Sequence, residues 1–191
     1  MKHNGPVTQQ AFPFPAGATL VSVTDPQGRI TYCNGPFVAV SGFDRAELMG
    51  QPHNLVRHPD MPEEAFRDLW DTVASGRPWS ALVKNRRKNG DHYWVRANVT
   101  PMRSGERIVG YLSVRSEPAR EEVQAAEALY ATMRDEAARG VRRTILRHGS
   151  VLQNTAAGRA RFVLVRSVDE LGGAQALWPV LAAAVGGLSA S

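Results

Sequence analysis

The sequence predicts an α+β fold: a five-stranded antiparallel sheet with short helices on one face, followed by a C-terminal helical segment. Three observations support this. Two short β-branched runs joined by a turn open the chain, only short helical patterns follow them, and three longer alternating runs complete the first 116 residues. Strands gathered on either side of a few helices, without regular alternation of strand and helix, favour a single antiparallel sheet.

Composition sets the class of protein. The chain has 191 residues, of which 43% are hydrophobic and 21% charged, and its net charge is +5. These values are typical of globular proteins and argue against a disordered or fibrous chain. The single cysteine excludes an internal disulfide and a cysteine-rich zinc site. The first thirty residues contain no secretory signal, so we expect a cytoplasmic protein.

The first two strands form a predicted hairpin. Residues 1–19 contain several prolines and glycines and are expected to form an extended N-terminal cap. Residues 20–24 and 30–33 are rich in β-branched side chains, as strands are. The Asp-Pro-Gln-Gly sequence between them has the residues of a tight turn.

Short helices are expected next. Asn34 can cap a helix that carries Phe37, Val40 and Phe43 at helical spacing, and residues 45–49 form another turn of helix. After an irregular polar segment at residues 51–61, the sequence Asp60-Met-Pro-Glu63 has the pattern of a capping box. The helix behind it has an apolar face formed by Phe66, Leu69, Trp70 and Val73.

Three strands complete the predicted sheet. They cover residues 79–86, 93–102 and 108–116. The dipeptide Asn89-Gly90 is a strong hairpin signal between the first two, and Ser104-Gly105 marks the turn before the third. Each strand is therefore expected to pair with the next in an antiparallel meander.

The chain continues into a linker helix over residues 117–139. Its apolar residues step by three and four positions, as in a coiled-coil seam: Val123, Ala126, Tyr130, Met133 and Ala137. The seam can pack on the sheet of its own chain or against a second copy, and the sequence leaves both alternatives open.

Residues 140–191 form a basic and apolar C-terminal region. Residues 137–168 contain seven Arg and no acidic residue, and residues 171–191 carry no charge. Four glycines, a glutamine and a proline make that last stretch a poor membrane span. The arginines suggest weak attraction to anionic lipid, and hence a place near the inner face of the cell membrane.

Two runs of sequence resemble a known family. Residues 50–62, GQPHNLVRHPDMP, and residues 83–95, VKNRRKNGDHYWV, are similar to the flavin-binding PAS domain of bacterial aerotaxis receptors. Asn34 with Phe37 and the Ser-Gly-Phe sequence at 41–43 resemble the first half of a PAS domain. The resemblance covers about residues 7–116 and implies a PAS fold, with the sensor domain itself at residues 20–116.

The resemblance implies a function. Aerotaxis receptors bind FAD without a covalent bond and use it for redox or oxygen sensing coupled to chemotaxis, so it implies signal transduction and no enzyme activity. Their chains continue through a membrane anchor, a HAMP linker and a signalling domain. Because 191 residues leave no room for that output, we expect a truncated receptor or a stand-alone sensor.

The same resemblance places the segment around Arg57, His58 and Asp60 in the FAD site. Arg57 has the geometry to pair with a phosphate, and His58 can donate to a phosphate or to the ring. From the residues alone, Asp60 would cap the helix and Arg57 would be a solvated surface charge. The resemblance favours the cofactor interpretation.

The remaining candidates would surround the flavin ring. Trp79 is preferred to Trp70 as the stacking residue, because Trp70 lies on the apolar helix face. Asn85 and Asn98 can match the alternating acceptors and donor of a flavin edge, although the alternation around Asn98 is ambiguous. The predicted cofactor-binding residues are Asn34, Arg57, His58, Asp60, Phe66, Trp79, Asn85, Tyr93 and Asn98.

Two alternative functions remain open on the sequence. The domain could be a cofactor-free PAS module for dimerisation or docking, or it could bind haem through His58 or His53. Expected partners are a second copy in a homodimer, a HAMP-like module or a chemotaxis signalling protein.

Other chemistries are not expected. Nucleic acid is disfavoured because the basic run at residues 86–88 lies beside a hairpin turn without interleaved aromatic residues. Cys33 precedes Asn34 and does not occupy the position of the reactive cysteine in light-sensing PAS relatives. No catalytic or metal-ligand pattern is recognisable in the sequence.

Overall fold

The structure, a computed structural model, describes residues 7–155 of the chain. The chain divides after Val151 into two units, and the description below concerns the first of them. The uncharged stretch at residues 171–191 and the arginines beyond residue 155 lie outside the described residues, so the expectation of membrane proximity stays a prediction. In the described part, no helix has the length and apolarity needed to span a membrane.

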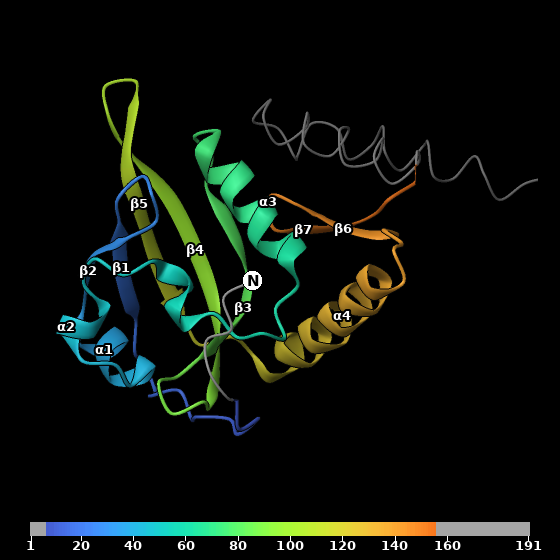
Figure 1. The fold of residues 1–191 in the computed structure, drawn as a ribbon, viewed down its shortest axis with the longest axis horizontal. Coiled ribbons are helices and arrows are strands. Elements are labelled where there is room, and N and C mark those ends of the chain that lie inside the picture. The colour runs from blue at the N-terminus through green and yellow to red at the C-terminus, as the bar shows by residue number, and fades with distance from the viewer. Residues whose placement is uncertain (1–6, 156–191) are drawn as a thin grey trace, which may run out of the picture. The chain divides into compact units, whose positions relative to one another are not determined.

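A five-stranded antiparallel sheet forms the centre of this unit (Figure 1). Its strands are β1 (Leu20–Thr24), β2 (Ile30–Cys33), β3 (Trp79–Arg86), β4 (His92–Ser104) and β5 (Arg107–Ser116), in the spatial order β2-β1-β5-β4-β3. Each of the four neighbouring pairs is antiparallel. The sheet confirms the predicted fold class.

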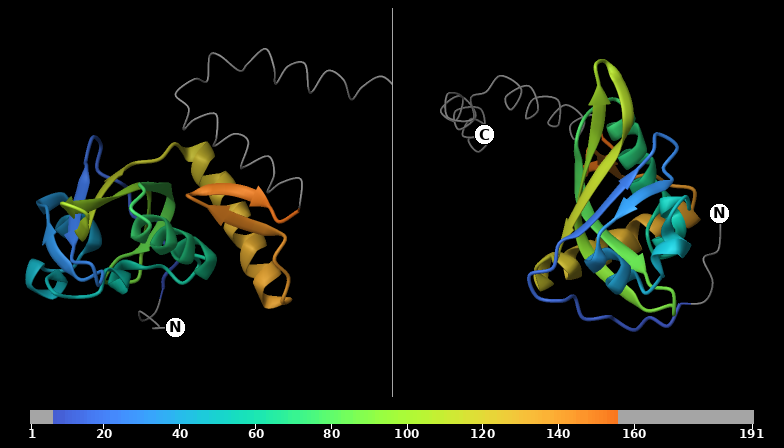
Figure 2. Two further views of the ribbon diagram at one scale, coloured as in Figure 1. Left: turned by 90° about the horizontal axis from the view of Figure 1, so that it is seen from above. Right: turned by 90° about the vertical axis from the view of Figure 1, so that its left-hand side faces the viewer.

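Short helices cover one face of the sheet, as Figure 2 shows. They are α1 (Gly35–Ser41), α2 (Arg45–Leu48), the 3₁₀ turn η1 (His53–Val56) and α3 (Glu63–Ala74). Asn34 starts α1: its side-chain oxygen accepts hydrogen bonds from the amides of Phe37 and Val21, and its amide group donates to the carbonyl of Thr19. One side chain thus caps the helix and fixes it to β1.

The start of α3 differs from the predicted capping box. The residue that precedes the helix is Pro62, and no side chain caps the helix there. Asp60 lies two residues farther back, where its carboxylate accepts a hydrogen bond from the ammonium group of Lys84 at 2.7 Å. A long-range ion pair has replaced the local cap that the sequence pattern indicates.

The linker helix α4 (Arg120–Ala138) packs on the sheet of its own chain. Ala126, Tyr130 and Met133 are buried. The Tyr130 hydroxyl donates to the carbonyl of Leu82 at 2.6 Å, and its ring stacks on Trp94 with 6.1 Å between centroids. Of the two alternatives that the sequence leaves open, the structure shows the intramolecular one.

A short hairpin follows α4 and contacts α3. Its strands are β6 (Thr144–Arg147) and β7 (Ser150–Gln153). The Asp68 carboxylate, on α3, accepts hydrogen bonds from the amides of His148 and Gly149, each at 2.7 Å, and from the indole of Trp79 at 2.8 Å. Gly149 has a φ of +81°, and a Cβ there would lie 1.9 Å from the carbonyl oxygen of Ser80, so only glycine fits.

The packing of α4 leads to a stability prediction. Tyr130→Ala removes a buried ring and a hydrogen bond, and we expect it to lower the free energy of unfolding by about 3–5 kcal/mol. Glu127→Ala, on the exposed side of the same helix, is the matched control and should change it by less than about 0.5 kcal/mol. The measurement is urea unfolding followed by circular dichroism. A Tyr130→Ala protein of unchanged stability that loses a dimer contact would show instead that the seam serves a second copy.

Candidate cofactor-binding site

A cavity of about 450 Å³ lies between α3, η1 and the sheet. Its size falls in the range of roughly 300–1,000 Å³ that is usual for small-molecule sites. Residues from η1 and α3, strands β1, β4 and β5 and the segment after α4 line it. They are Thr24, His53, Asn54, Arg57, Glu63, Glu64, Phe66, Arg67, Leu69, Trp70, Val99, Tyr111, Ser113, Arg115 and Arg142.

Apolar and aromatic side chains form opposing walls of this cavity. Phe66, Leu69 and Trp70 come from α3, and Val99 and Tyr111 from the sheet. The ring of Trp70 meets Tyr111 edge to face at 5.5 Å between centroids. Such walls suit a flat aromatic ligand.

A buried arginine reaches this cavity from β5. Arg115 is 5% exposed, and its guanidinium donates to the Ser22 hydroxyl at 3.0 Å and to Nε2 of His53 at 2.8 Å. Among the ion pairs of residues 7–155, none includes Arg115. Burial lowers its pKa to about 10, so it is still a cation at neutral pH. The cavity therefore contains a positive charge that has no carboxylate partner within residues 7–155.

His53 is the neutral partner of this cation. Because Arg115 donates to its Nε2, that nitrogen must be an acceptor and the ring must be uncharged. Burial, with the nearby charge of Arg115 as a second cause, lowers the pKa of His53 to about 3. The ring is thus neutral across the physiological range.

Several polar atoms around the cavity have no hydrogen-bond partner among the described residues. Thr24 Oγ1 and Ser113 Oγ line it, and both side chains are buried. Asn85 Nδ2 and the Tyr93 hydroxyl, on the same face of the sheet, are in the same condition. Buried polar groups usually have a hydrogen-bond partner, so the hydroxyls of Thr24 and Ser113, which line the cavity, fit a ligand that offers hydrogen-bonding groups.

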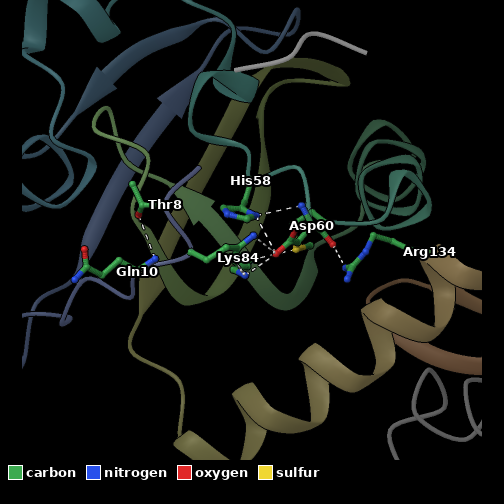
Figure 3. A network of polar contacts seen from close by, with 8 residues as sticks. Thr8, Gln10, His58, Asp60, Lys84 and Arg134 are labelled. Carbon is green, nitrogen blue, oxygen red and sulfur yellow. Dashed lines mark hydrogen bonds and ion pairs between the residues drawn. The ribbon is translucent and has the colours of Figure 1, made fainter. Parts of the chain in front are cut away.

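The segment with His58 and Asp60 is held by a polar network (Figure 3). The His58 ring is fully buried, and its Nδ1 accepts a hydrogen bond from the backbone amide of Asp60. The Asp60 carboxylate pairs with Lys84, and its carbonyl accepts from Arg134 of α4. Burial, and then the charge of Lys84, lower the pKa of His58 to about 4. The network ties this segment to β3 and α4.

The predicted residues divide into two groups. Arg57 and Phe66 line the cavity, and the guanidinium of Arg57 lies 3.8 Å from the centroid of the Phe66 ring. Asn85 and Tyr93 are register partners on the face that the helices cover, but neither is among the lining residues; Arg57 forms a backbone bridge to Asn85. His58 and Asp60 are not among the lining residues, and they brace the segment that carries Arg57.

Three predicted residues lie elsewhere. Asn98 is exposed, because Ala97 and Val99 on either side of it face the helices. Trp79 is buried with its indole on Asp68, and Trp70, 40% exposed, lines the cavity in its place. Asn34 uses its side chain for the α1 cap and the bonds to residues 19 and 21.

The sequence reasoning missed the sheet side of the cavity. Tyr111, Ser113 and Arg115 alternate with Leu112 and Val114 along β5, and the first three face the helices. A strand whose polar residues are more buried than its apolar ones is unusual. The alternation was present in the sequence and could have indicated a polar cavity.

The family now follows from comparison with known proteins. Residues 30–115, which span most of the sheet and the helices that face it, match the family model described as the PAS fold. The chain contains a PAS domain. This confirms the fold that the sequence resemblance implies.

The proteins to which this PAS domain is similar are much longer than the matched region. The chain is 57% identical over 124 residues to the aerotaxis receptor of Escherichia coli, a match that covers 65% of this chain and 24% of the receptor. It is 31% identical to the biofilm dispersion protein of Pseudomonas aeruginosa over 47% of the chain and 22% of that protein. The chain thus spans less than a quarter of the length of these relatives.

Solved structures share the fold. A light-oxygen-voltage domain studied with a flavin analogue aligns with a TM-score of 0.52 at 21% identity, covering 62% of this chain and 88% of that one. The dark-state LOV domain of the blue-light photoreceptor aureochrome-1 aligns with a TM-score of 0.51 at 20% identity, covering 62% and 86%. At these identities the likeness concerns the fold alone.

The neutral His53 predicts a pH dependence of stability. In the unfolded chain His53 titrates near 6.5, whereas in the folded domain it resists protonation down to about pH 3. Protons therefore bind the unfolded state more readily, and stability should fall as pH drops below about 6.5, by up to about 1.4 kcal/mol per pH unit for this group. His58 acts in the same direction.

Urea unfolding of the cofactor-free protein at several pH values between 7 and 4.5 measures this effect. His53→Gln should give a shallower decline than the unsubstituted chain. Equal slopes for the two proteins would show that His53 does not contribute.

Proposed function

We propose that the PAS domain binds FAD in the cavity between α3 and the sheet and works as a redox or oxygen sensor of a motility pathway. The observation that carries the proposal is Arg115, a buried cation that reaches a cavity with aromatic walls and has no carboxylate partner among the described residues. The 57% identity to an aerotaxis receptor supports the pathway.

The residues fit a flavin on chemical grounds. The walls that contain Phe66, Trp70 and Tyr111 suit a flat ring system. Thr24 and Ser113 each place a hydroxyl without a protein partner at the cavity, where a ring edge with donors and acceptors could pair with them. Arg57 and Arg67 supply cations for the phosphates.

A bound flavin supplies the redox change, since reduction adds negative charge to its ring. In this cavity Arg115 would stabilise that charge directly, because it is buried and the local dielectric is low. His53 accepts its bond from Arg115, so a stronger interaction of Arg115 with the cofactor would change the bond to His53 as well. Ser22, the third member of this group, belongs to β1.

Two structural connections can carry such a change to the rest of the chain. Arg115 lies on β5 only five positions before the start of α4. On the other side of the cavity, α3 contributes Phe66 and Trp70 to the walls and holds the β6–β7 turn through Asp68. The change in redox state would thus alter how α4 and the hairpin are held.

The output would be a change in protein contacts. The expected partners are a second copy, a HAMP-like module or a chemotaxis signalling protein. Since Tyr130 and Met133 are used inside the chain, we propose that a dimer would form through other surfaces. We propose a sensory role without catalysis.

The two alternatives have less support from the geometry. A haem needs a histidine nitrogen facing the cavity, but Nε2 of His53 is engaged by Arg115 and His58 is not among the lining residues. A cofactor-free docking module would have no use for the hydroxyls of Thr24 and Ser113, which have no hydrogen-bond partner in the described part of the chain. The visible spectrum of freshly purified protein decides: flavin bands support the proposal, a Soret band indicates haem, and a colourless protein that stays so with added FAD refutes flavin binding.

Arg115 leads to a prediction on redox potential. Arg115→Gln removes the buried charge, and we expect the midpoint potential of the bound flavin to fall by about 30–60 mV, which corresponds to about 1.4–2.8 kcal/mol for two electrons. Arg115→Lys should restore much of the difference. Arg96→Gln is the control, since Arg96 pairs with Glu122 on the far face. A potential unchanged in Arg115→Gln would remove this role.

A substitution at Ser113 tests whether its hydroxyl contacts a ligand or supports the fold. Ser113→Ala removes a buried hydroxyl that has no protein partner, so the cofactor-free domain should keep its stability or gain about 1 kcal/mol. The same variant should bind flavin several-fold more weakly by fluorescence titration. Ser80→Ala, at an exposed position of β3, should change neither quantity. Loss of stability together with unchanged affinity would assign Ser113 a structural role only.

A further inference from the structure

A second cavity adjoins the first and extends toward the end of α4. Its volume is about 360 Å³, and it lies between residues 59–64 and the chain from Met133 to Thr144. Glu63, Glu64 and Arg142 line both cavities. The two spaces therefore share a boundary formed by two residues at the start of α3 and by Arg142 after α4.

The lining of the second cavity has an apolar part and a polar part, and the polar part consists of Glu63, Glu64, Arg134, Glu136, Arg142 and Thr144. Pro59, Met61 and Pro62 come from the segment before α3, and Met133, Ala137 and Val141 come from α4 and the residues after it. Met61 and Met133 are buried, whereas Val141 is 36% exposed. Thioethers and proline rings make good contacts with the faces and edges of aromatic rings. The apolar part suits a small flat ring, and the polar part offers hydrogen-bonding groups to the substituents of such a ring.

Charged side chains of both signs lie at the junction between the cavities, where Glu63 and Glu64 meet Arg142. Arg142 pairs with Glu64 at 2.8 Å, and Arg67 pairs with the same carboxylate. Arg57 lines the first cavity close by, on the segment before α3. Guanidinium groups bind phosphates in a bidentate manner. Glu64 now pairs with both Arg67 and Arg142. An anionic linker at this place could pair with the two arginines instead of Glu64.

We propose that the adenosine end of a dinucleotide flavin binds in the second cavity and that its pyrophosphate is bound by Arg67 and Arg142. This inference rests on the proposed flavin site and adds to it the residues that select FAD over flavin mononucleotide. Met133, Ala137, Val141 and Arg142 lie outside residues 30–115, the part that matches the PAS family. On this proposal, the cofactor site includes the end of α4 and the segment after it, beyond the part of the chain that matches the PAS family.

A direct consequence concerns the segment after α4. Arg142 and Val141 are exposed and connect α4 to β6. With the dinucleotide bound, they contact the cofactor on one side of the junction while residues 59–64 contact it on the other. FAD would then hold this connection in place, and flavin mononucleotide would not.

The experiment compares three ligands on the full chain: riboflavin, flavin mononucleotide and FAD, each measured by equilibrium dialysis. Ala137→Glu puts a charge into the second cavity at an exposed helical position, where it does not disturb the core. We expect its FAD affinity to fall about tenfold, equivalent to about 1.4 kcal/mol, with the other two ligands changed less than about twofold. Arg142→Gln should weaken FAD more than riboflavin, and Arg143→Gln, the neighbouring control, should weaken neither.

Hydrogen exchange gives a second measurement. Amides at residues 139–144 should be protected when FAD is added and not when riboflavin is added. If Ala137→Glu changes all three affinities equally, or none, while the unsubstituted chain binds flavin, the second cavity is not the adenosine site and the proposed function stands. If the unsubstituted chain binds none of the three ligands, both the proposed function and this inference fail.

Discussion

The guanidinium of Arg115 lies at the centre of the domain, and its burial sets conditions for its surroundings. An uncompensated charge in an interior is costly unless it is hydrogen-bonded. Ser22 and His53 supply those bonds, which in turn requires His53 to be neutral and η1 to lie against β1. Arg115 also lines the open space that takes the place of a packed core at this point of the helix-covered face.

Much of the fold could be predicted because its signals are local. The Asn89-Gly90 turn, the β-branched strands and the amphipathic α3 each depend on a few neighbouring residues. The site depends on distant ones. No residue near Asp60 in the sequence indicates that its carboxylate will pair with Lys84, 24 positions later. The period of α3 places Trp70 on an apolar face, but it does not tell whether that face meets side chains or a cavity.

The strands differ in how well the sequence predicts which of their residues face the helices. Along β5 the residues that point toward the helices are polar, so the usual assumption that apolar side chains point inward gives the opposite face. Along β4 the same assumption gives the correct face, since Ala97 and Val99 are buried under the helices and Asn98 is exposed. The hairpin of β6 and β7 was not predicted, because each strand has only four residues and so carries too short an alternation to stand out in a basic segment.

The hydrogen bonds that the Asp68 carboxylate accepts have a consequence for where the folded domain ends. Three donors converge on one carboxylate of α3, and two of them belong to the turn at His148 and Gly149. A chimaera that joins this sensor to a foreign effector after Ser116 would leave Asp68 with one of those donors and uncover the surface under α4. The transplantable unit is therefore the sheet together with its helix and hairpin, and a fusion point after Gln153, where β7 ends, keeps that unit whole.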